Sequence, residues 1–372
     1  YNVGHCFYHG IGVEENNEQA AYWFLQAAQQ DYPHALLLMG ECYTYGYGVE
    51  QDVQRAAEYY QQAADQQFAP AQCELGRCYE FGSGVSQDLE QARLLYQLAA
   101  KQGYAPAECN LGYLHYRGIG TQVDYKQAVY WFSEAARQDY PRALLLLGMC
   151  YEQGKGVEQD IGHAVQLYHQ AAEQGYAPAQ FELGCRYQTG RGVSKNLEQS
   201  VRLFQLAAEQ GDAQAQYALG VCYHCGDGVE QNYVKAVYFY KLAADQGLYP
   251  AQYTLGLCYE EGIGVSRDVK AAVYWYQLAA DQGEREAQYR LGYLYEIGQG
   301  VSPDHIRAVQ LYRRAAEQQH GLAQYRLGYC YQNGLGVIKN KSMAKMWYRS
   351  AAEQGVAEAR QALKHLKWWR LI

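Results

Sequence analysis

Few residues in this 372-residue chain have the types and spacing that chemistry requires. Cys222, His224 and Cys225 place three soft ligands within four residues, which suits zinc, but a structural zinc site needs a fourth ligand. No second ligand pair occurs elsewhere in register. His5 and His9 stand four residues apart on one face of a predicted helix, where a surface pair explains them without a metal. The sequence therefore predicts no metal site.

Ten G-x-G segments, from Gly10 and Gly12 to Gly334 and Gly336, could be mistaken for phosphate-binding loops. Each follows a predicted helix rather than a strand, and none has the spacing of a dinucleotide fingerprint or the Lys-Ser/Thr pair of a P-loop. No constellation of acidic, His or Ser side chains supplies a nucleophile with a base. The sequence predicts a protein that is not an enzyme and has no cofactor.

The G-x-G segments belong to a repeat of 36 residues that runs through the whole chain. Glycine recurs at every thirty-sixth position from Gly4 to Gly328, and we call these ten residues the repeat glycines. A double alanine, from Ala27-Ala28 to Ala351-Ala352, follows the same period, as does a glutamine from Gln30 to Gln354. A fixed period of this length indicates stacked supersecondary units that share one core.

Each repeat has the pattern of two helices. The first has a one-sided apolar stripe and ends at G-x-G, because glycine tolerates the left-handed geometry of a helix end. Twelve residues after the repeat glycine comes a short acceptor that suits an N-cap of the second helix: Asn16, Asp52, Asp88, Asp124, Asp160, Asn196, Asn232, Asp268, Asp304 and Asn340. A lone hairpin cannot bury both stripes. The sequence predicts an all-α, right-handed superhelical α/α solenoid of ten 36-residue helix-turn-helix repeats.

We expect one domain over residues 1–372, with a truncated first repeat (1–32), nine full repeats (33–356) and a C-terminal capping helix (357–372). Trp368 and Trp369 are expected to fold back on the last repeat; a docking tail for a partner is the alternative. The chain begins with Tyr1, so we interpret it as a fragment or a processed product, and the lack of a leader says nothing about export.

The repeat resembles a known family. The pattern A-x-x-x-L-G-x-x-Y-x-x-G-x-G-V-x-x-D-x-x-x-A, followed by an aromatic residue and A-A-x-x-G, is present almost literally over 251–283. This is similar to the Sel1-like repeat, a relative of the tetratricopeptide repeat, and the resemblance covers essentially the whole chain. It implies adaptor or scaffold proteins of bacterial envelope, signalling and host-interaction systems or of eukaryotic quality-control complexes, which are typically not enzymes.

Composition limits the partners and the compartment. The net charge of −8 disfavours nucleic acid, and no apolar run approaches the length of a membrane span. Seven of the eleven cysteines stand two residues after a repeat glycine, where other repeats carry Leu114 and Leu294. This is a small apolar core position, and equivalent cysteines one repeat apart are too distant for a disulfide. A reducing, cytoplasmic compartment is favoured over a secreted or periplasmic one.

Function in a solenoid lies where repeats differ. Three residues before the repeat glycine, opposite the apolar stripe, successive repeats carry aromatic residues that we call the tyrosine ladder: Phe181, Tyr217, Tyr253, Tyr289 and Tyr325. By similarity to tetratricopeptide arrays this is the concave surface. Further members of the predicted protein-binding site follow the repeat glycine by one or four residues: Tyr113, Tyr293, Tyr329, Glu260 and Glu296. Tyrosine suits binding surfaces, and the glutamates favour a partner with basic residues. Alternatively, the tyrosines only pack on neighbouring helices.

We therefore hypothesise a non-enzymatic scaffold that captures a protein or peptide segment on this face. Three alternatives remain. One is a structural rod that self-associates through its leucine-rich segments (36–38 and 144–147) or its open end. Another is the regulatory repeat region of a larger protein whose active domain lies outside this chain. The last is carbohydrate binding, because tyrosine rings can stack on sugars.

Overall fold

A computed structural model describes residues 1–368 of the chain, with side chains described up to residue 365. All regular structure in residues 1–368 is α-helical, in agreement with the predicted fold class. The chain divides into two compact units, which we call the N-terminal unit (residues 1–186 and 190–194) and the C-terminal unit (residues 187–189 and 195–372). The prediction of a single domain therefore stays a prediction.

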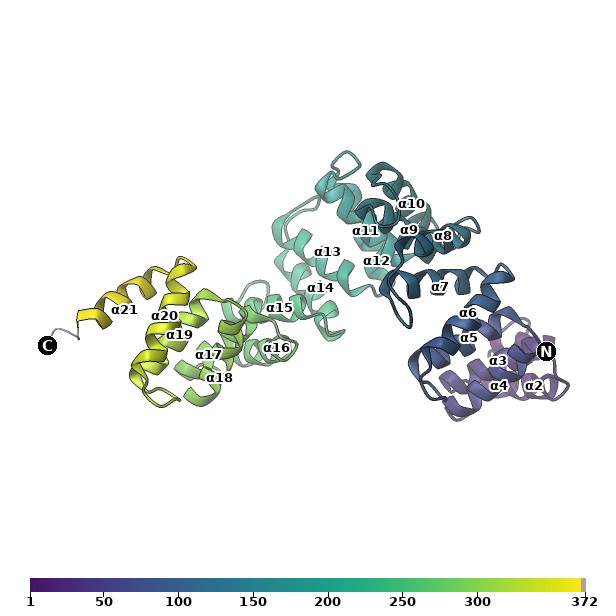
Figure 1. The fold of residues 1–372 in the computed structure, drawn as a ribbon, viewed down its shortest axis with the longest axis horizontal. Coiled ribbons are helices and arrows are strands. Elements are labelled where there is room, and N and C mark those ends of the chain that lie inside the picture. Colours follow the sequence, from purple (N-terminus) through teal and green to yellow (C-terminus); the bar gives the residue numbers. More distant parts are fainter. Residues whose placement is uncertain (369–372) are drawn as a thin grey trace. The chain divides into compact units, whose positions relative to one another are not determined.

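Each repeat contributes two helices joined by a short turn (Figure 1). The first helices are α1 (Asn2–His9), α3 (Pro33–Tyr45), α5 (Ala69–Phe81), α7 (Ala105–Arg117), α9 (Pro141–Gln153), α11 (Ala177–Thr189), α13 (Ala213–Cys225), α15 (Tyr249–Glu261), α17 (Arg285–Ile297) and α19 (Gly321–Asn333). The second helices are α2 (Asn17–Ala28), α4 (Val53–Asp65), α6 (Leu89–Lys101), α8 (Tyr125–Ala136), α10 (Ile161–Glu173), α12 (Leu197–Glu209), α14 (Tyr233–Asp245), α16 (Val269–Asp281), α18 (His305–Glu317) and α20 (Lys341–Glu353).

The predicted N-caps are confirmed in all ten repeats. Each Asp or Asn side chain accepts a hydrogen bond from a backbone N–H of the first helical turn. Asp268, for example, accepts from the N–H groups of Lys270 and Ala271 at 3.0 and 3.1 Å. These bonds satisfy backbone donors that have no partner within the helix, so the short acceptor fixes where each second helix begins.

The repeat glycine is required by an aromatic ring of the second helix. A Cβ atom added to Gly256 would lie 2.6 Å from the ring of Tyr276, a residue with no exposed surface. The same contact recurs between Gly40 and Tyr60 in the N-terminal unit. The two helices of a hairpin therefore pack closely where the repeat glycine of the first helix contacts the aromatic ring of the second. Alanines fill the remaining core, and Ala279 is also fully buried.

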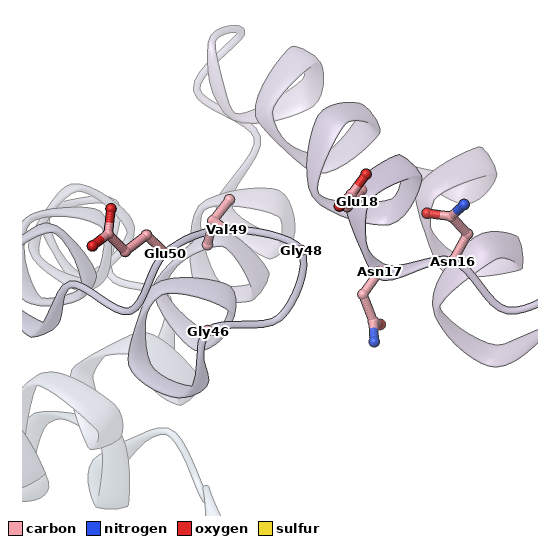
Figure 2. A pocket seen from close by; sticks show the side chains of 7 residues that line it. All are labelled: Asn16, Asn17, Glu18, Gly46, Gly48, Val49 and Glu50. Atoms are coloured by element: carbon pink, nitrogen blue, oxygen red, sulfur yellow. The ribbon is translucent and has the colours of Figure 1, made fainter.

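From the second repeat onward, the second glycine of each G-x-G turn brings adjacent repeats into contact. A Cβ on Gly48 would lie 1.9 Å from the backbone oxygen of Asn17 at the start of α2 (Figure 2). A Cβ on Gly264 would likewise lie 2.3 Å from the backbone oxygen of Tyr233. Any larger residue would push the turn off the neighbouring repeat. The G-x-G segments are therefore packing elements between hairpins.

The recurrent glutamine connects both helices of a repeat with the preceding repeat. Gln282 donates from Nε2 to Oε1 of Gln252 at 2.8 Å, and Gln252 donates to the carbonyl oxygen of Ala244 in the preceding repeat at 3.2 Å. We call this arrangement the glutamine bridge. It recurs at Gln216 and Gln288, both of which are buried. Buried amides with both groups satisfied fix how one hairpin docks on the next.

The predicted capping helix is present as α21 (Ala357–Trp368), which packs against α20. Ala359 is fully buried against the last repeat, and Leu363 is half-buried there. The predicted folding back of Trp368 and Trp369 lies outside the residues whose side chains the structure describes. None of the described helices is both long enough and apolar enough to cross a membrane.

Candidate functional site

The four tyrosines of the tyrosine ladder lie in the C-terminal unit, where they are half-buried rather than sealed in the core. Each of them packs against the core tyrosine of the second helix in its own repeat, with ring centroids 5.6–6.1 Å apart: Tyr217 on Tyr240, Tyr253 on Tyr276, Tyr289 on Tyr312 and Tyr325 on Tyr348. One side of every ring is thereby held in place while part of the side chain stays accessible. The rings are both structural supports and surface.

The remaining predicted aromatic residues occupy similar environments. Tyr113 and Tyr293 are half-buried, Tyr329 is exposed, and Phe181 on α11 is half-buried. Arginine side chains lie over two of these rings: Arg142 is 5.5 Å from the centroid of Tyr113 and Arg326 is 5.1 Å from that of Tyr293. Such cation–π contacts restrict both partners, so these rings are also held in defined positions.

Glu260 and Glu296 have partners inside the array. Glu260 accepts a hydrogen bond from the Tyr276 hydroxyl at 2.5 Å, and Glu296 accepts one from Tyr312. These bonds recur in the N-terminal unit, where Tyr96 donates to Glu80 at 2.7 Å. The glutamate four residues after the repeat glycine thus satisfies the hydroxyl of the core tyrosine. One acceptor site of this carboxylate is therefore occupied by an internal hydrogen bond even without a ligand.

Two arginines that the sequence analysis did not select complete this surface. Arg290 reaches Glu260 of the preceding repeat at 3.5 Å, and Arg326 reaches Glu296 at 3.3 Å. Burial raises the pKa of Tyr253 despite the opposing effect of Arg290, so the phenol stays neutral. The sequence signal for these arginines was a basic residue two positions before the repeat glycine in two successive repeats. The carboxylate that each arginine meets depends on how the repeats stack, which the sequence does not show.

The leucine-rich segments contribute mainly to the core of the N-terminal unit. Leu36 is fully buried, and Leu144 and Leu147 are 2% and 5% exposed. At the ladder position the N-terminal unit has Cys73 and Cys109, which are also buried, and Tyr1 and Phe181, which are half-buried. Within the two segments Leu37, Leu38 and Leu146 are half-buried, so the segments offer little apolar surface for self-association.

The soft side chains do not gather into a metal site. Cys222 is buried in the core position predicted for it, whereas Cys225 is exposed at the end of α13. Burial raises the pKa of Cys222 to about 11, and of Cys42 and Cys150 to about 12, which disfavours the thiolate that would bind a metal or attack a substrate. Within residues 1–368 no group of three His, Cys, Asp or Glu side chains could hold a metal ion.

A further surface pocket lies where the turn after α3 meets the start of α2. Asn16, Asn17 and Glu18 line one side, and the turn with Gly46 and Gly48, followed by Val49 and Glu50, lines the other. Figure 2 shows that the Glu18, Glu50 and Asn17 side chains point in different directions and do not converge on a common point. This pocket is a consequence of the contact between repeats and presents no set of groups for chemistry.

The fold and this surface define a helical repeat protein of the tetratricopeptide-like class. The family model described as Sel1 repeat matches ten segments: residues 1–32, 33–68, 69–104, 105–140, 141–176, 177–212, 213–248, 250–284, 285–320 and 321–356. The chain belongs to the Sel1 repeat family, which confirms the resemblance noted in the sequence. Sel1 repeat proteins generally act as non-catalytic scaffolds for protein interaction.

Solved structures support the same assignment. A protective antigen present in uropathogenic Escherichia coli strains, which displays an SLR fold, is 34% identical with a TM-score of 0.67; the match covers 100% of this chain and 79% of that one. A Sel1 repeat protein from Oxalobacter formigenes is also 34% identical, with a TM-score of 0.59 over 83% of this chain and 89% of that one. No curated protein matches this chain.

Proposed function

We propose that the chain is a scaffold whose tyrosine ladder binds an extended or helical segment of a partner protein. The supporting observation is that Tyr217, Tyr253, Tyr289 and Tyr325 are each braced by a ring contact and yet remain half-exposed in successive repeats. Rings already fixed in position lose little side-chain entropy when a partner covers them. Large aromatic side chains in a row also supply the contact area that dominates binding energy in many interfaces.

The charges beside the ladder make the surface selective. Glu260 and Glu296 are partly used by Arg290 and Arg326, so the surface presents alternating signs. A lysine or arginine of the partner would have to share these carboxylates with the internal arginines. The proposal therefore includes a preference for partners with basic residues. This preference is weakened because Arg290 and Arg326 compete for the same carboxylates.

The test compares tyrosines of the ladder with exposed tyrosines on second helices of the same unit. A random peptide library is selected on the full chain, and the recovered peptides are measured against two double variants. Tyr253→Ala with Tyr289→Ala should reduce affinity by about tenfold or more, since hot-spot tyrosines exceed about 1 kcal/mol each. Tyr238→Ala with Tyr274→Ala, two second-helix residues that are each 58% exposed, is the matched control and should leave affinity unchanged.

Because Tyr253 and Tyr289 also brace core rings, the ladder variant must first be shown to keep its helical circular dichroism. The variants Tyr253→Phe and Tyr289→Phe retain the rings and should keep most of the affinity. Equal loss of affinity in the ladder and control variants, or none in either, would refute the proposed surface. A preference for glycans over peptides in parallel binding assays would favour the carbohydrate alternative.

A further inference from the structure

A second cleft lies in the N-terminal unit, on the face formed by α5, α7 and the start of α9. It encloses a cavity of about 340 Å³. Aromatic rings form much of its wall, and the polar side chains of Asn110 and Arg142 stand at one side: the lining includes Arg77, Tyr96, Asn110, Tyr113, Tyr140 and Arg142. This volume suits one large side chain together with its stretch of backbone.

Arg142 stands six residues before the repeat glycine, a position that varies among the repeats. Four of them carry proline there (Pro70, Pro106, Pro178 and Pro250), and the others carry His34, Gln214, Glu286 or Leu322. Its Nη1 donates to Oδ1 of Asn110 at 2.8 Å, and its guanidinium lies 5.5 Å from the ring centroid of Tyr113. Both partners are neutral. They fix the direction of the guanidinium without cancelling its charge.

Several other arginines on first helices have carboxylate partners. In the N-terminal unit Arg77 pairs with Glu74 at 2.8 Å and Arg186 with Glu152 at 2.6 Å. Arg290 and Arg326 of the C-terminal unit pair in the same manner. Across the part of the chain that the structure describes, Arg142 forms no ion pair.

The two carboxylates in the cavity wall already have partners of their own. Glu74 is held by Arg77, and Glu80 accepts the hydrogen bond of the Tyr96 hydroxyl at 2.7 Å. Tyr113 and Tyr140, which line the cavity together with Arg142, carry no charge as phenols. Arg142 therefore presents a fixed, half-buried guanidinium that forms no ion pair with any described residue, although the wall also contains the Glu80 carboxylate, whose hydroxyl partner is neutral.

We propose that this cavity receives an acidic side chain, Asp or Glu, of a bound peptide, with its carboxylate on Arg142. A guanidinium binds a carboxylate through two parallel hydrogen bonds, which are among the strongest available to a protein surface. The methylene groups of the ligand side chain pack against Tyr113 and Tyr140. This inference uses residues of the N-terminal unit only and does not depend on the tyrosine ladder.

The probes are fluorescein-labelled peptide pools of equal length that share one fixed central residue (Glu, Gln, Lys or phosphoserine) in otherwise random sequence. Binding to the full chain is followed by fluorescence polarisation at about 0.15 M salt. The Glu pool should bind about tenfold more tightly than the Gln pool, as expected for charge-assisted hydrogen bonds, and the Lys pool no more tightly than the Gln pool.

Arg142→Gln should abolish the difference between the Glu and Gln pools, and Arg142→Lys should retain part of it because the charge remains. Arg117→Gln removes an equal charge from an exposed position at the end of α7 and should preserve the difference. Helical circular dichroism confirms that each variant is folded. The double variant Tyr253→Ala, Tyr289→Ala should also preserve the difference in affinity between the Glu and Gln pools. This result separates the proposal for the cavity from the proposal for the tyrosine ladder.

Equal binding of the Glu and Gln pools overturns the inference, as does a difference that survives Arg142→Gln. If Arg142→Gln and Arg117→Gln reduced the difference between the Glu and Gln pools equally, the difference would come from the overall charge of the chain. That result would also overturn the inference. Binding of the phosphoserine pool alone, competed by inorganic phosphate, would overturn the assignment to a carboxylate.

Discussion

Replacing Glu108 with glutamine should stabilise the N-terminal unit. Glu108 occupies the glutamine-bridge position of its repeat, is only 5% exposed, and accepts a hydrogen bond from Nε2 of Gln138 at 2.9 Å. Gln252 and Gln288 of other repeats use their own Nε2 to donate to a carbonyl oxygen eight residues earlier, at 3.2 and 3.1 Å. An ionised carboxylate has no such donor to offer, whereas glutamine keeps the acceptor and adds the donor.

The expected gain is about 2 kcal/mol in the free energy of unfolding at neutral pH. One new buried hydrogen bond contributes about 0.5–1.5 kcal/mol, and removing a buried carboxylate with incomplete hydrogen bonding contributes about 1 kcal/mol more. The substitution also removes the repulsion between Glu108 and Glu134, a second carboxylate close enough to affect its pKa.

The gain should depend on pH. Burial, and then Glu134, raise the pKa of Glu108 above its ordinary value of 4.5. A carboxyl group whose pKa is higher in the folded state binds its proton more tightly there, so the wild-type protein gains stability as pH falls through the folded pKa towards 4.5. Protonated Glu108 can also donate like glutamine. The advantage of Glu108→Gln should therefore be largest near pH 7.5 and should shrink as the pH approaches 4.5.

Urea unfolding of the full chain, followed by circular dichroism at several pH values between 5 and 7.5, measures this difference. Hydrogen exchange in α6–α8 assigns it to the repeat concerned. Glu58→Gln, an exposed substitution in α4, is the control and should change stability by less than about 0.5 kcal/mol. A Glu108→Gln protein that is no more stable at pH 7.5, or whose advantage does not shrink on acidification, would refute the reasoning.

Three smaller changes test other parts of the repeat, each by urea unfolding. Gln319→Gly should stabilise by about 0.5–1 kcal/mol, because Gln319 has a φ of 63° that favours glycine; a loss of stability would contradict this. Gly256→Ala should destabilise by about 1–2 kcal/mol by overpacking Tyr276, and a gain would show that the ring moves aside freely. Asp268→Ala should cost about 1 kcal/mol by removing the cap of α16, whereas Asp268→Asn should be nearly neutral.

The helices were predictable because their signals are local. An Asp or Asn acceptor before an apolar stripe, and a glycine after it, act within one turn of backbone, and the period of 36 residues repeated these signals ten times. The pairing of the repeat glycine with an aromatic ring of the second helix was not predicted, because it depends on how the two helices face each other. After the second helix, where several repeats carry a glycine such as Gly247, the repeats with Gln67 and Gln319 adopt the same positive φ.

The partners of polar side chains were less predictable. The sequence shows that a glutamine recurs, but only the stacking of hairpins shows that Gln282 meets Gln252 and that Gln252 meets the preceding repeat. The sequence shows that Glu260 lies opposite the apolar stripe of the first helix, which suggested a charge for a ligand. It does not show that the Tyr276 hydroxyl donates to this carboxylate. Contacts between helices depend on crossing geometry, which the period alone does not specify.

The positions that break the repeat are the ones that distinguish this chain from a generic array. Each repeat contacts mainly its neighbours, so a substitution on the first-helix face alters binding at one place while the shared core continues to hold the hairpins together. Arg142 illustrates this, because it stands at a position that varies among the repeats, while Pro141 one position earlier is the proline at the start of α9. The cavity thereby contains a cation whose only described partners are neutral.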